Sequence, residues 1–188
     1  ATRFASEKGV EVLLDALPKV CAEFPNTMVL FAGQYEDVMG EEAYLKRLLP
    51  VIEEYQARGQ WKFLGVLDPA HMSAFYPNLD ALVVPSLNST ETFGLVQIEA
   101  MINGVPSVAS NLPGVRQPPQ MTGMGKVVPI GDAEALAEAL VDIFANPQAY
   151  RGDPAGVAQQ FDPRVNAEAY ECLYLELLEE LSATGFQG

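Results

Sequence analysis

Two glutamates, Glu91 and Glu99, lie on either side of a predicted helix start, in the stretch from residue 85 to residue 101. Gly94 falls between them, at the first turn of that helix. The first amides of a helix have no partner within it and carry partial positive charge, so a phosphate group binds well there. Gly94 has no Cβ and lets a ligand approach the backbone closely. This stretch therefore predicts a phosphate-binding turn with one carboxylate before it and another after it.

The spacing of the second carboxylate indicates what it would bind. Glu99 follows Gly94 by five residues, which is roughly 7.5 Å along a helix axis. That separation suits a ribose joined to the phosphate, and a carboxylate can accept hydrogen bonds from both ribose hydroxyls. Glu91 would face the group beyond the phosphates, either a sugar hydroxyl or a developing positive charge. Each glutamate alone has an ordinary explanation, as a helix-dipole partner or a solvated side chain, but their combination with Gly94 favours a binding site.

Two cations near the start of the chain, Arg3 and Lys8, flank a loop that leads into the first predicted helix. We expect both at the same edge of the sheet as the two glutamates, within reach of a diphosphate. Two cations and a helix terminus can together neutralise a departing diphosphate without a metal ion. The alternative interpretation, a pair of solvated surface cations, stays open on spacing alone.

Strand and helix patterns alternate along the chain. Pro50 falls inside one predicted helix and is expected to kink it or split it in two, and residues 146–160, rich in Gly, Pro and Gln, are expected to form a loop. The predicted strands are 28–33, 61–65, 81–86, 106–110 and 126–129, and the predicted helices are 10–24, 41–58, 69–76, 94–103, 132–144 and 163–181.

This alternation predicts an α/β fold: a doubly wound, mostly parallel sheet with helices on both faces. Ligands bind such sheets outside the carboxyl ends of the strands, which is where the two glutamates fall. We expect a single domain over residues 1–188. A doubly wound sheet normally opens with a strand, whereas this chain enters a helix almost at once, so we expect the first strand to be truncated.

Composition excludes several classes of function. Hydrophobic residues make up 49% of the 188 residues, so disorder is not expected. The net charge of −14 disfavours nucleic-acid partners and direct adhesion to an anionic bilayer. No apolar run approaches the roughly 20 residues of a membrane-spanning helix. With a single histidine and no Asp-x-Asp sequence, we expect no metal site and no cofactor.

The stretch Glu91-Thr-Phe-Gly-Leu-Val-Gln-Ile-Glu99 followed by Gly104 and Pro106 resembles the paired-glutamate signature of retaining glycosyltransferases of family 4. Arg3 and Lys8-Gly9 resemble the Gly-Arg and Lys-Gly motif that opens the second half of those enzymes, with Thr2 in place of the usual glycine. The family has the GT-B architecture of two Rossmann-like domains. The resemblance covers essentially the whole chain and corresponds to the carboxy-terminal, nucleotide-sugar-binding domain, with residues 163–182 as its crossover helix.

The resemblance implies a role for each of these residues. Arg3 and Lys8 would bind the donor diphosphate and stabilise the leaving group, and Glu91 would contact the transferred sugar. Glu99 would bind the ribose. The backbone amides of Phe93, Gly94 and Leu95 would lie near the sugar and the phosphates. Val66, in the loop after the second predicted strand, would contact the nucleobase.

These expectations define a retaining glycosyltransferase domain that takes a UDP-sugar or GDP-sugar and no metal. The acceptor, a glycan, a lipid or a small molecule, would bind through an amino-terminal half, so this domain alone is expected to be inactive. A noncatalytic subunit that pairs with a separate acceptor-binding chain is an open alternative, as is an epimerase or phosphorylase of the same architecture. We expect a cytoplasmic location, with peripheral association at the inner membrane face left open for the full-length protein.

Overall fold

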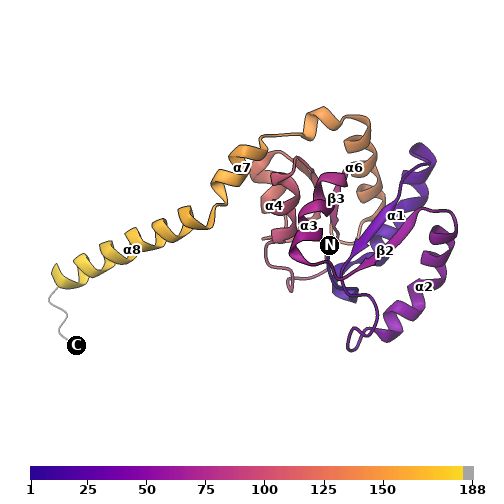
Figure 1. Ribbon diagram of the computed structural model, residues 1–188, viewed down its shortest axis with the longest axis horizontal. Coiled ribbons are helices and arrows are strands. Elements are labelled where there is room, and N and C mark those ends of the chain that lie inside the picture. Colours follow the sequence, from indigo (N-terminus) through magenta and orange to yellow (C-terminus); the bar gives the residue numbers. More distant parts are fainter. Residues whose placement is uncertain (184–188) are drawn as a thin grey trace.

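Five short strands form two parallel ladders in residues 1–183, which are the residues that this computed structural model describes (Figure 1). One ladder joins β1 (Val29–Ala32) to β2 (Trp61–Gly65), and the other joins β3 (Leu82–Val84), β4 (Ser107–Ser110) and β5 (Gly125–Val128) in that order. Every pairing is parallel. The predicted α/β architecture is confirmed, but the expected single sheet is divided, because no strand pairing joins β1 to β3 in the described residues.

Strand β4 shows how the helices cover both faces of the larger ladder. All of its residues are buried, and neighbouring side chains point to opposite faces. Val108 packs with α1 (Val10–Glu23) and α6 (Ala133–Ala145), whereas Ala109 packs with α3 (Pro69–Phe75) and α4 (Leu95–Ile102). A strand buried on both faces need not alternate between polar and apolar residues, and β4 consists of small residues throughout: Ser107, Val108, Ala109 and Ser110.

The smaller ladder has its own apolar core. Phe4 is fully buried there, with its ring centroid 5.5 Å from Phe31 of β1 and 5.4 Å from Tyr44 of α2 (Glu42–Ala57). Trp61 of β2 stacks on Phe31 in the same cluster. Aromatic side chains thus fix the segment that carries Arg3 and Lys8 against the sheet.

Pro50 does not split its helix in two, so that part of the expectation is wrong. Helix α2 runs without interruption through Pro50, and α1 does the same through Pro18. Proline removes the hydrogen bond to the carbonyl four residues earlier, which for Pro50 is the carbonyl of Lys46. Pro50 and Lys46 are both exposed, so water can take the place of the lost amide.

Residues 146–160 do not form the expected loop. They form η3 (Pro147–Tyr150) and α7 (Pro154–Gln160). The Asp153 carboxylate accepts a hydrogen bond from the Gly156 amide at 3.0 Å, and Pro154 occupies the first turn. Asp followed by Pro is a helix-start signal, but the Gly and Gln content of the stretch obscured it. A further helix, α5 (Gln117–Thr122), was also not predicted.

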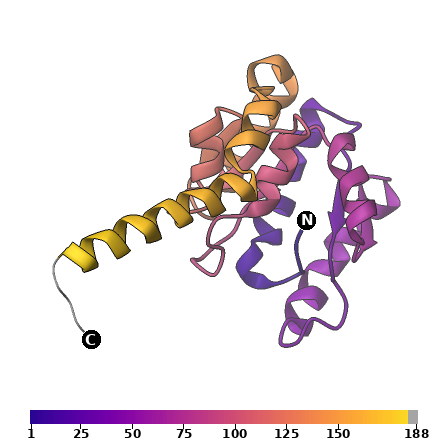
Figure 2. The ribbon, with the colours of Figure 1, turned by 60° about the vertical axis from the view of Figure 1, so that its left-hand side comes forward.

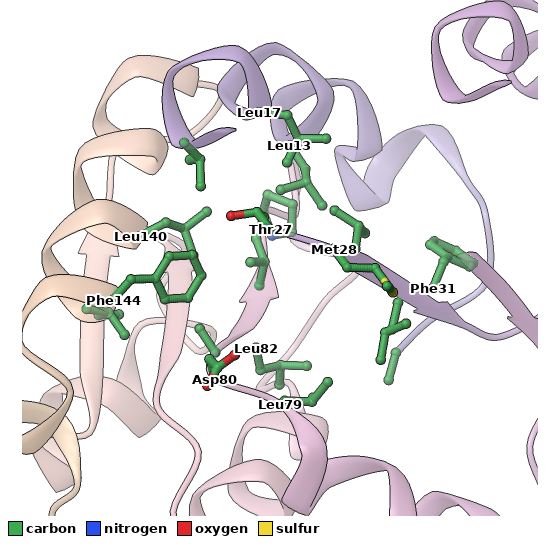
Figure 3. Close-up of a pocket in the computed structure, with 18 of the residues that line it drawn as sticks. Leu13, Leu17, Thr27, Met28, Phe31, Leu79, Asp80, Leu82, Leu140 and Phe144 are labelled. Carbon is green, nitrogen blue, oxygen red and sulfur yellow. The ribbon is translucent and has the colours of Figure 1, made fainter. Parts of the chain in front are cut away.

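An apolar cavity of about 580 Å³ lies between the two ladders, here named the interladder cavity (Figure 3). Its walls come from both ladders and from the helices above them. Figure 3 shows the side chains that surround it, among them Leu13, Leu17, Met28, Leu79, Leu82, Leu140 and Phe144. Apolar side chains from α1, α6 and β3 therefore face a common space.

The backbone at the edges of the interladder cavity is arranged for a further parallel strand. Thr2 N–H donates to the Ala32 carbonyl at 2.8 Å and Phe4 N–H to the Gln34 carbonyl at 2.7 Å, so this segment runs parallel to β1. On the other side, Leu82 N–H donates to the Pro106 carbonyl, toward β4. Backbone groups alternate in direction along a strand, so those of Val83 face the cavity.

The last helix, α8 (Pro163–Ala183), projects away from the rest of the molecule (Figures 1 and 2). Side chains are described as far as residue 181, and those of α8 are exposed. The exposed residues include both acidic and large apolar side chains, among the latter Tyr170, Leu173, Tyr174, Leu177 and Leu181. The expectation that residues 163–182 cross to another domain stays a prediction.

Candidate functional site

The loop after β3 carries Glu91, Phe93 and Gly94 to the start of α4, at the carboxyl end of the larger ladder. Gly94 is the N-cap of α4 with φ of 75°, a left-handed conformation that favours glycine. A Cβ there would lie 2.9 Å from Nε2 of the Gln97 side chain. Within residues 1–183 no side chain caps this end of α4, so amides of its first turn could bind an anion. The turn therefore begins at a left-handed glycine, and phosphate binding there stays a prediction.

Gln97 holds that turn in place, a role that the sequence did not suggest. Its side chain is fully buried. The amide nitrogen donates to the Phe93 carbonyl at 3.2 Å and to the Val115 carbonyl at 2.9 Å, and the Ser107 hydroxyl donates to its oxygen at 2.8 Å. A buried polar side chain with all of these partners fixes the backbone around it. The sequence signal for this role is weak, because Gln97 is one of two polar residues, with Glu99, in the otherwise apolar stretch 95–102.

Two further contacts fix the loop. The Phe93 ring packs against Phe161, with 6.0 Å between centroids. Gly114, in the loop after β4, lies very close to the loop that bears Glu91: a Cβ on Gly114 would be 1.5 Å from the Thr92 carbonyl oxygen. Leu95, in contrast, projects outward and is 68% exposed. The predicted residues Phe93, Gly94 and Leu95 thus contribute an ordered backbone rather than a set of converging side chains.

Lys8 and Glu91 form an ion pair, with 2.6 Å between Lys8 Nζ and Glu91 Oε2. Both side chains are mostly buried, with 15% and 22% exposed. Gly9 makes the contact possible because it has φ of 67° and because a Cβ there would lie 2.1 Å from the Pro85 carbonyl oxygen. The turn after η1 (Ser6–Lys8) therefore lies directly against the end of β3. The structure confirms that Lys8 and Glu91 share one edge of the sheet.

Arg3 pairs with Glu7 rather than with either predicted glutamate. The Arg3 side chain is 58% exposed, whereas that of Glu7 is 13% exposed. Burial would raise the pKa of the Glu7 carboxyl, but a backbone hydrogen bond and the Arg3 guanidinium lower it overall. The Leu87 amide donates to the Glu7 carbonyl at 2.9 Å, so Arg3, Glu7 and Lys8 belong to one segment docked beside the loop that bears Glu91.

Glu99 lies on the exposed face of α4, and its Oε2 accepts a hydrogen bond from the Tyr76 hydroxyl. Tyr76 is therefore the hydrogen-bonded partner of the Glu99 carboxylate.

The sequence profile of the family described as "Glycosyl transferases group 1" matches residues 1–153. The chain belongs to the group 1 glycosyltransferases. This match confirms the resemblance at the level of glycosyltransferase and transferase; the narrower assignment to family 4 stays a prediction.

Two relatives show the extent of the similarity between this glycosyltransferase chain and known proteins. It is 31% identical over 180 residues to the phosphatidyl-myo-inositol mannosyltransferase of Mycolicibacterium smegmatis, covering 96% of this chain and 44% of that protein. It is 37% identical over 139 residues to the protein of the same name from Mycobacterium leprae, covering 74% of this chain and 34% of that protein. The chain thus spans less than half the length of these relatives.

Solved structures agree on the fold. Sucrose-phosphate synthase from Thermosynechococcus elongatus superposes with a TM-score of 0.72 at 30% identity, over 98% of this chain and 45% of that one. Anabaena HepE in complex with UDP and glucose superposes with a TM-score of 0.73 at 25% identity, over 92% of this chain and 47% of that one. The Rossmann-like architecture of one half of a GT-B glycosyltransferase is therefore confirmed.

The interladder cavity is not the candidate site of this glycosyltransferase chain. Lys8 and Thr2 are among the residues that line it, whereas Glu91 and Glu99 are not. Most of the lining side chains are apolar. Val66, expected near a nucleobase, lies in the loop after β2 and is 77% exposed. This loop follows a strand of the smaller ladder, and the contact of Val66 with a nucleobase stays a prediction.

Two classes of feature are missing from the described part of the chain. In residues 1–183 no cluster of three or more His, Cys, Asp or Glu side chains has the geometry to hold a metal ion. No helix in the same residues is both long enough and apolar enough to cross a bilayer.

Proposed function

We propose that this chain is the donor-binding part of a retaining glycosyltransferase that takes a UDP-sugar or a GDP-sugar. The observation that carries the proposal is the ion pair between Lys8 and Glu91, with 2.6 Å between Nζ and Oε2. It brings a phosphate-binding cation and a carboxylate together beside the uncapped start of α4. A nucleotide sugar has its diphosphate and its transferred sugar joined at one bond, and this pair of charges suits the two sides of that bond.

Each charged group would stabilise one side of the breaking bond. As the bond between the sugar and the diphosphate breaks, negative charge grows on the diphosphate and positive charge on the sugar ring. Lys8, Arg3 and the first amides of α4 would stabilise the diphosphate, and the Glu91 carboxylate would stabilise the oxocarbenium-like sugar. Lys8 would then exchange its contact with Glu91 for one with the diphosphate. In this proposal no metal ion takes part.

Glu99 would hold the nucleoside end of the donor. The carboxylate has two oxygens, and Tyr76 occupies a lone pair of Oε2. The remaining lone pairs can accept from ribose hydroxyls. Anabaena HepE, whose structure contains UDP and glucose, supports a uridine donor.

We propose further that the acceptor, a glycan, a lipid or a small molecule, binds mainly through a separate amino-terminal half. The name of the Mycolicibacterium relative, phosphatidyl-myo-inositol mannosyltransferase, supports a lipid among these classes. The isolated chain would bind donor weakly and transfer little, because domain closure completes such sites. A cytoplasmic location with peripheral contact to the inner membrane face suits such an acceptor. The noncatalytic alternative gains no support from these observations.

Calorimetric titration of the chain with UDP and with GDP tests the proposal. We expect one nucleotide to bind and the substitution Glu99→Ala to weaken that binding about a hundredfold, since two ribose hydroxyls would donate to this carboxylate and hydrogen bonds to charged groups contribute about 1.5–3 kcal/mol each. Glu54→Ala is the matched variant: Glu54 is an exposed helical glutamate on α2, paired at 3.4 Å with Arg58, and should leave binding unchanged. Equal affinity of wild type and Glu99→Ala, or no heat from either nucleotide with a folded sample, would contradict the proposal.

A further inference from the structure

Tyr76 is a buried tyrosine whose hydroxyl is aimed at a proposed ligand-binding carboxylate. It is 3% exposed and opens η2 (Tyr76–Asn78), directly after α3. Its hydroxyl donates to Glu99 Oε2 on α4. The roles proposed above do not use Tyr76. Its hydrogen bond nevertheless joins the apolar core to a side chain on the exposed face of a helix.

The Tyr76 ring is held firmly. Its centroid lies 5.5 Å from that of Phe75 in an edge-to-face arrangement, and the ring belongs to the apolar cluster that includes Leu82, Val84 and Ala100. Burial, together with the Glu99 carboxylate, raises the pKa of the Tyr76 hydroxyl well above its usual range. The hydroxyl therefore stays protonated at working pH and acts as a hydrogen-bond donor at a fixed point.

Glu99 needs such a fixed point. It lies on the exposed face of α4, where an untethered glutamate samples several rotamers and loses that freedom when it binds a ligand. The hydrogen bond to Tyr76 selects one carboxylate position before any ligand arrives. Preorganisation of this kind increases affinity because less conformational entropy is lost on binding.

We propose that Tyr76 is a positioning residue for the ribose subsite: it holds Glu99 through Oε2 and leaves the other lone pairs of the carboxylate directed at the ribose hydroxyls. This inference rests on the proposed function, because it needs Glu99 to bind a ribose. Tyr76 itself touches no part of the donor. It acts through Glu99, and its effect is confined to the part of the affinity that the ribose hydroxyls provide.

The test compares two ligands that differ only in those hydroxyls. The affinities of UDP and of 2′,3′-dideoxyuridine diphosphate are measured by calorimetry, or those of the guanosine pair if GDP is the ligand that binds. Their ratio in the wild type is the preference for ribose. We expect Tyr76→Phe, which keeps the ring and removes the hydroxyl, to reduce this ratio about tenfold, or about 1.4 kcal/mol. The affinity for the dideoxy ligand should stay within about twofold of wild type, roughly 0.4 kcal/mol.

Tyr44 provides the matched variant. It is also buried, at 7% exposed, and its hydroxyl, on α2, donates to the carboxylate of Glu11 on α1. Tyr44→Phe removes the same kind of hydrogen bond at a place away from Glu99. We expect it to lower the thermal midpoint about as much as Tyr76→Phe does and to leave the ribose preference unchanged.

The outcomes separate this inference from the proposed function. A wild-type chain that binds both ligands equally would overturn the ribose role of Glu99 and the inference with it. A preference that Glu99→Ala abolishes but Tyr76→Phe retains would overturn the inference alone, as would equal weakening of both ligands by Tyr76→Phe. Loss of the preference in Glu99→Ala and Tyr76→Phe, but not in Tyr44→Phe, would support both.

Discussion

Lys8 and Glu91 are separated by 83 residues in the sequence and by 2.6 Å between their charged atoms. The two cations of the candidate site, Arg3 and Lys8, are each paired with a carboxylate, Glu7 and Glu91 respectively. A diphosphate would have to compete with these carboxylates for both cations. The more buried pair, Lys8 with Glu91, competes more strongly with the diphosphate. Exposed pairs such as Arg3 with Glu7 are screened by solvent and therefore compete less.

Replacing Lys8 tests the diphosphate site at the level of one residue. We expect Lys8→Met to weaken nucleoside diphosphate binding about tenfold, since charge-assisted hydrogen bonds contribute about 1.5–3 kcal/mol, and to leave binding of the bare nucleoside unchanged. Calorimetry with UDP and uridine, or GDP and guanosine, measures both. Lys46→Met, at an exposed position of α2, serves for comparison. Equal losses in the two variants, or an equal loss for the nucleoside, would refute the assignment.

At the scale of elements, glycines set the distances between segments that carry the site. Gly9 lets the turn after η1 contact the Pro85 carbonyl, and Gly114 lets the loop after β4 contact the Thr92 carbonyl. Gly33, after β1, makes a similar approach to the Thr2 carbonyl, where a Cβ would be 1.8 Å away. These contacts join segments that are distant in sequence. The glycines let the backbones of those segments come close enough for their side chains to lie near one another.

Gly9→Ala tests whether close approach, rather than backbone conformation alone, maintains the site. Gly59 has a similar φ of 72°, but a Cβ there would meet nothing within 4 Å. Gly59→Ala should therefore cost about 1–2 kcal/mol for the left-handed conformation. Gly9→Ala should cost about 1–3 kcal/mol more, because its Cβ overlaps a backbone oxygen.

Urea unfolding measures the free energy of unfolding of both variants, and hence the difference in destabilisation between them. Titration with the nucleoside diphosphate should in addition show weaker binding only for Gly9→Ala, since that change displaces Lys8 from Glu91. Equal destabilisation by the two substitutions would show that contact with Pro85 contributes nothing.

At the scale of the whole molecule, the interladder cavity interrupts the apolar packing between the two ladders. It separates β1 from β3, and apolar side chains of α1 and α6 face it (Figure 3). Polar backbone groups on a strand edge are stabilised when another strand pairs with them. The segment from Thr2 to Phe4 already pairs with residues at the carboxyl end of β1 in the parallel direction, which sets the direction and register that an added strand would continue.

An added strand should therefore stabilise the chain. We expect five alternating valine and isoleucine residues fused before Ala1 to raise the thermal midpoint by at least about 4 °C, because 1 kcal/mol shifts a domain of this size by about 2–4 °C. Five alternating glycine and serine residues at the same place should have little effect, since they fill no apolar volume. Circular dichroism melts measure both, and an equal midpoint for the two fusions would count against strand pairing in the cavity.

The sequence alone determined the features that depend on local chemistry. Alternating apolar runs and helical periodicities predicted the α/β class and the strand spans, because burial on one or both faces leaves a regular pattern. Gly94 and the glutamates around it predicted an anion-binding helix start, because unpaired amides and a small residue are local properties. The helix at 154–160 was missed because its capping signal lay in a stretch of loop-like composition.

Only the tertiary structure decided which side chains meet. Gln97 looked like any polar helical residue until its partners on β4 and in the following loop were visible. The sequence likewise gave no indication that the Tyr76 hydroxyl donates to Glu99. These contacts depend on how elements pack and on how closely Gly9 and Gly114 let backbones approach. No local pattern encodes them, because the partners of each contact come from separate parts of the chain.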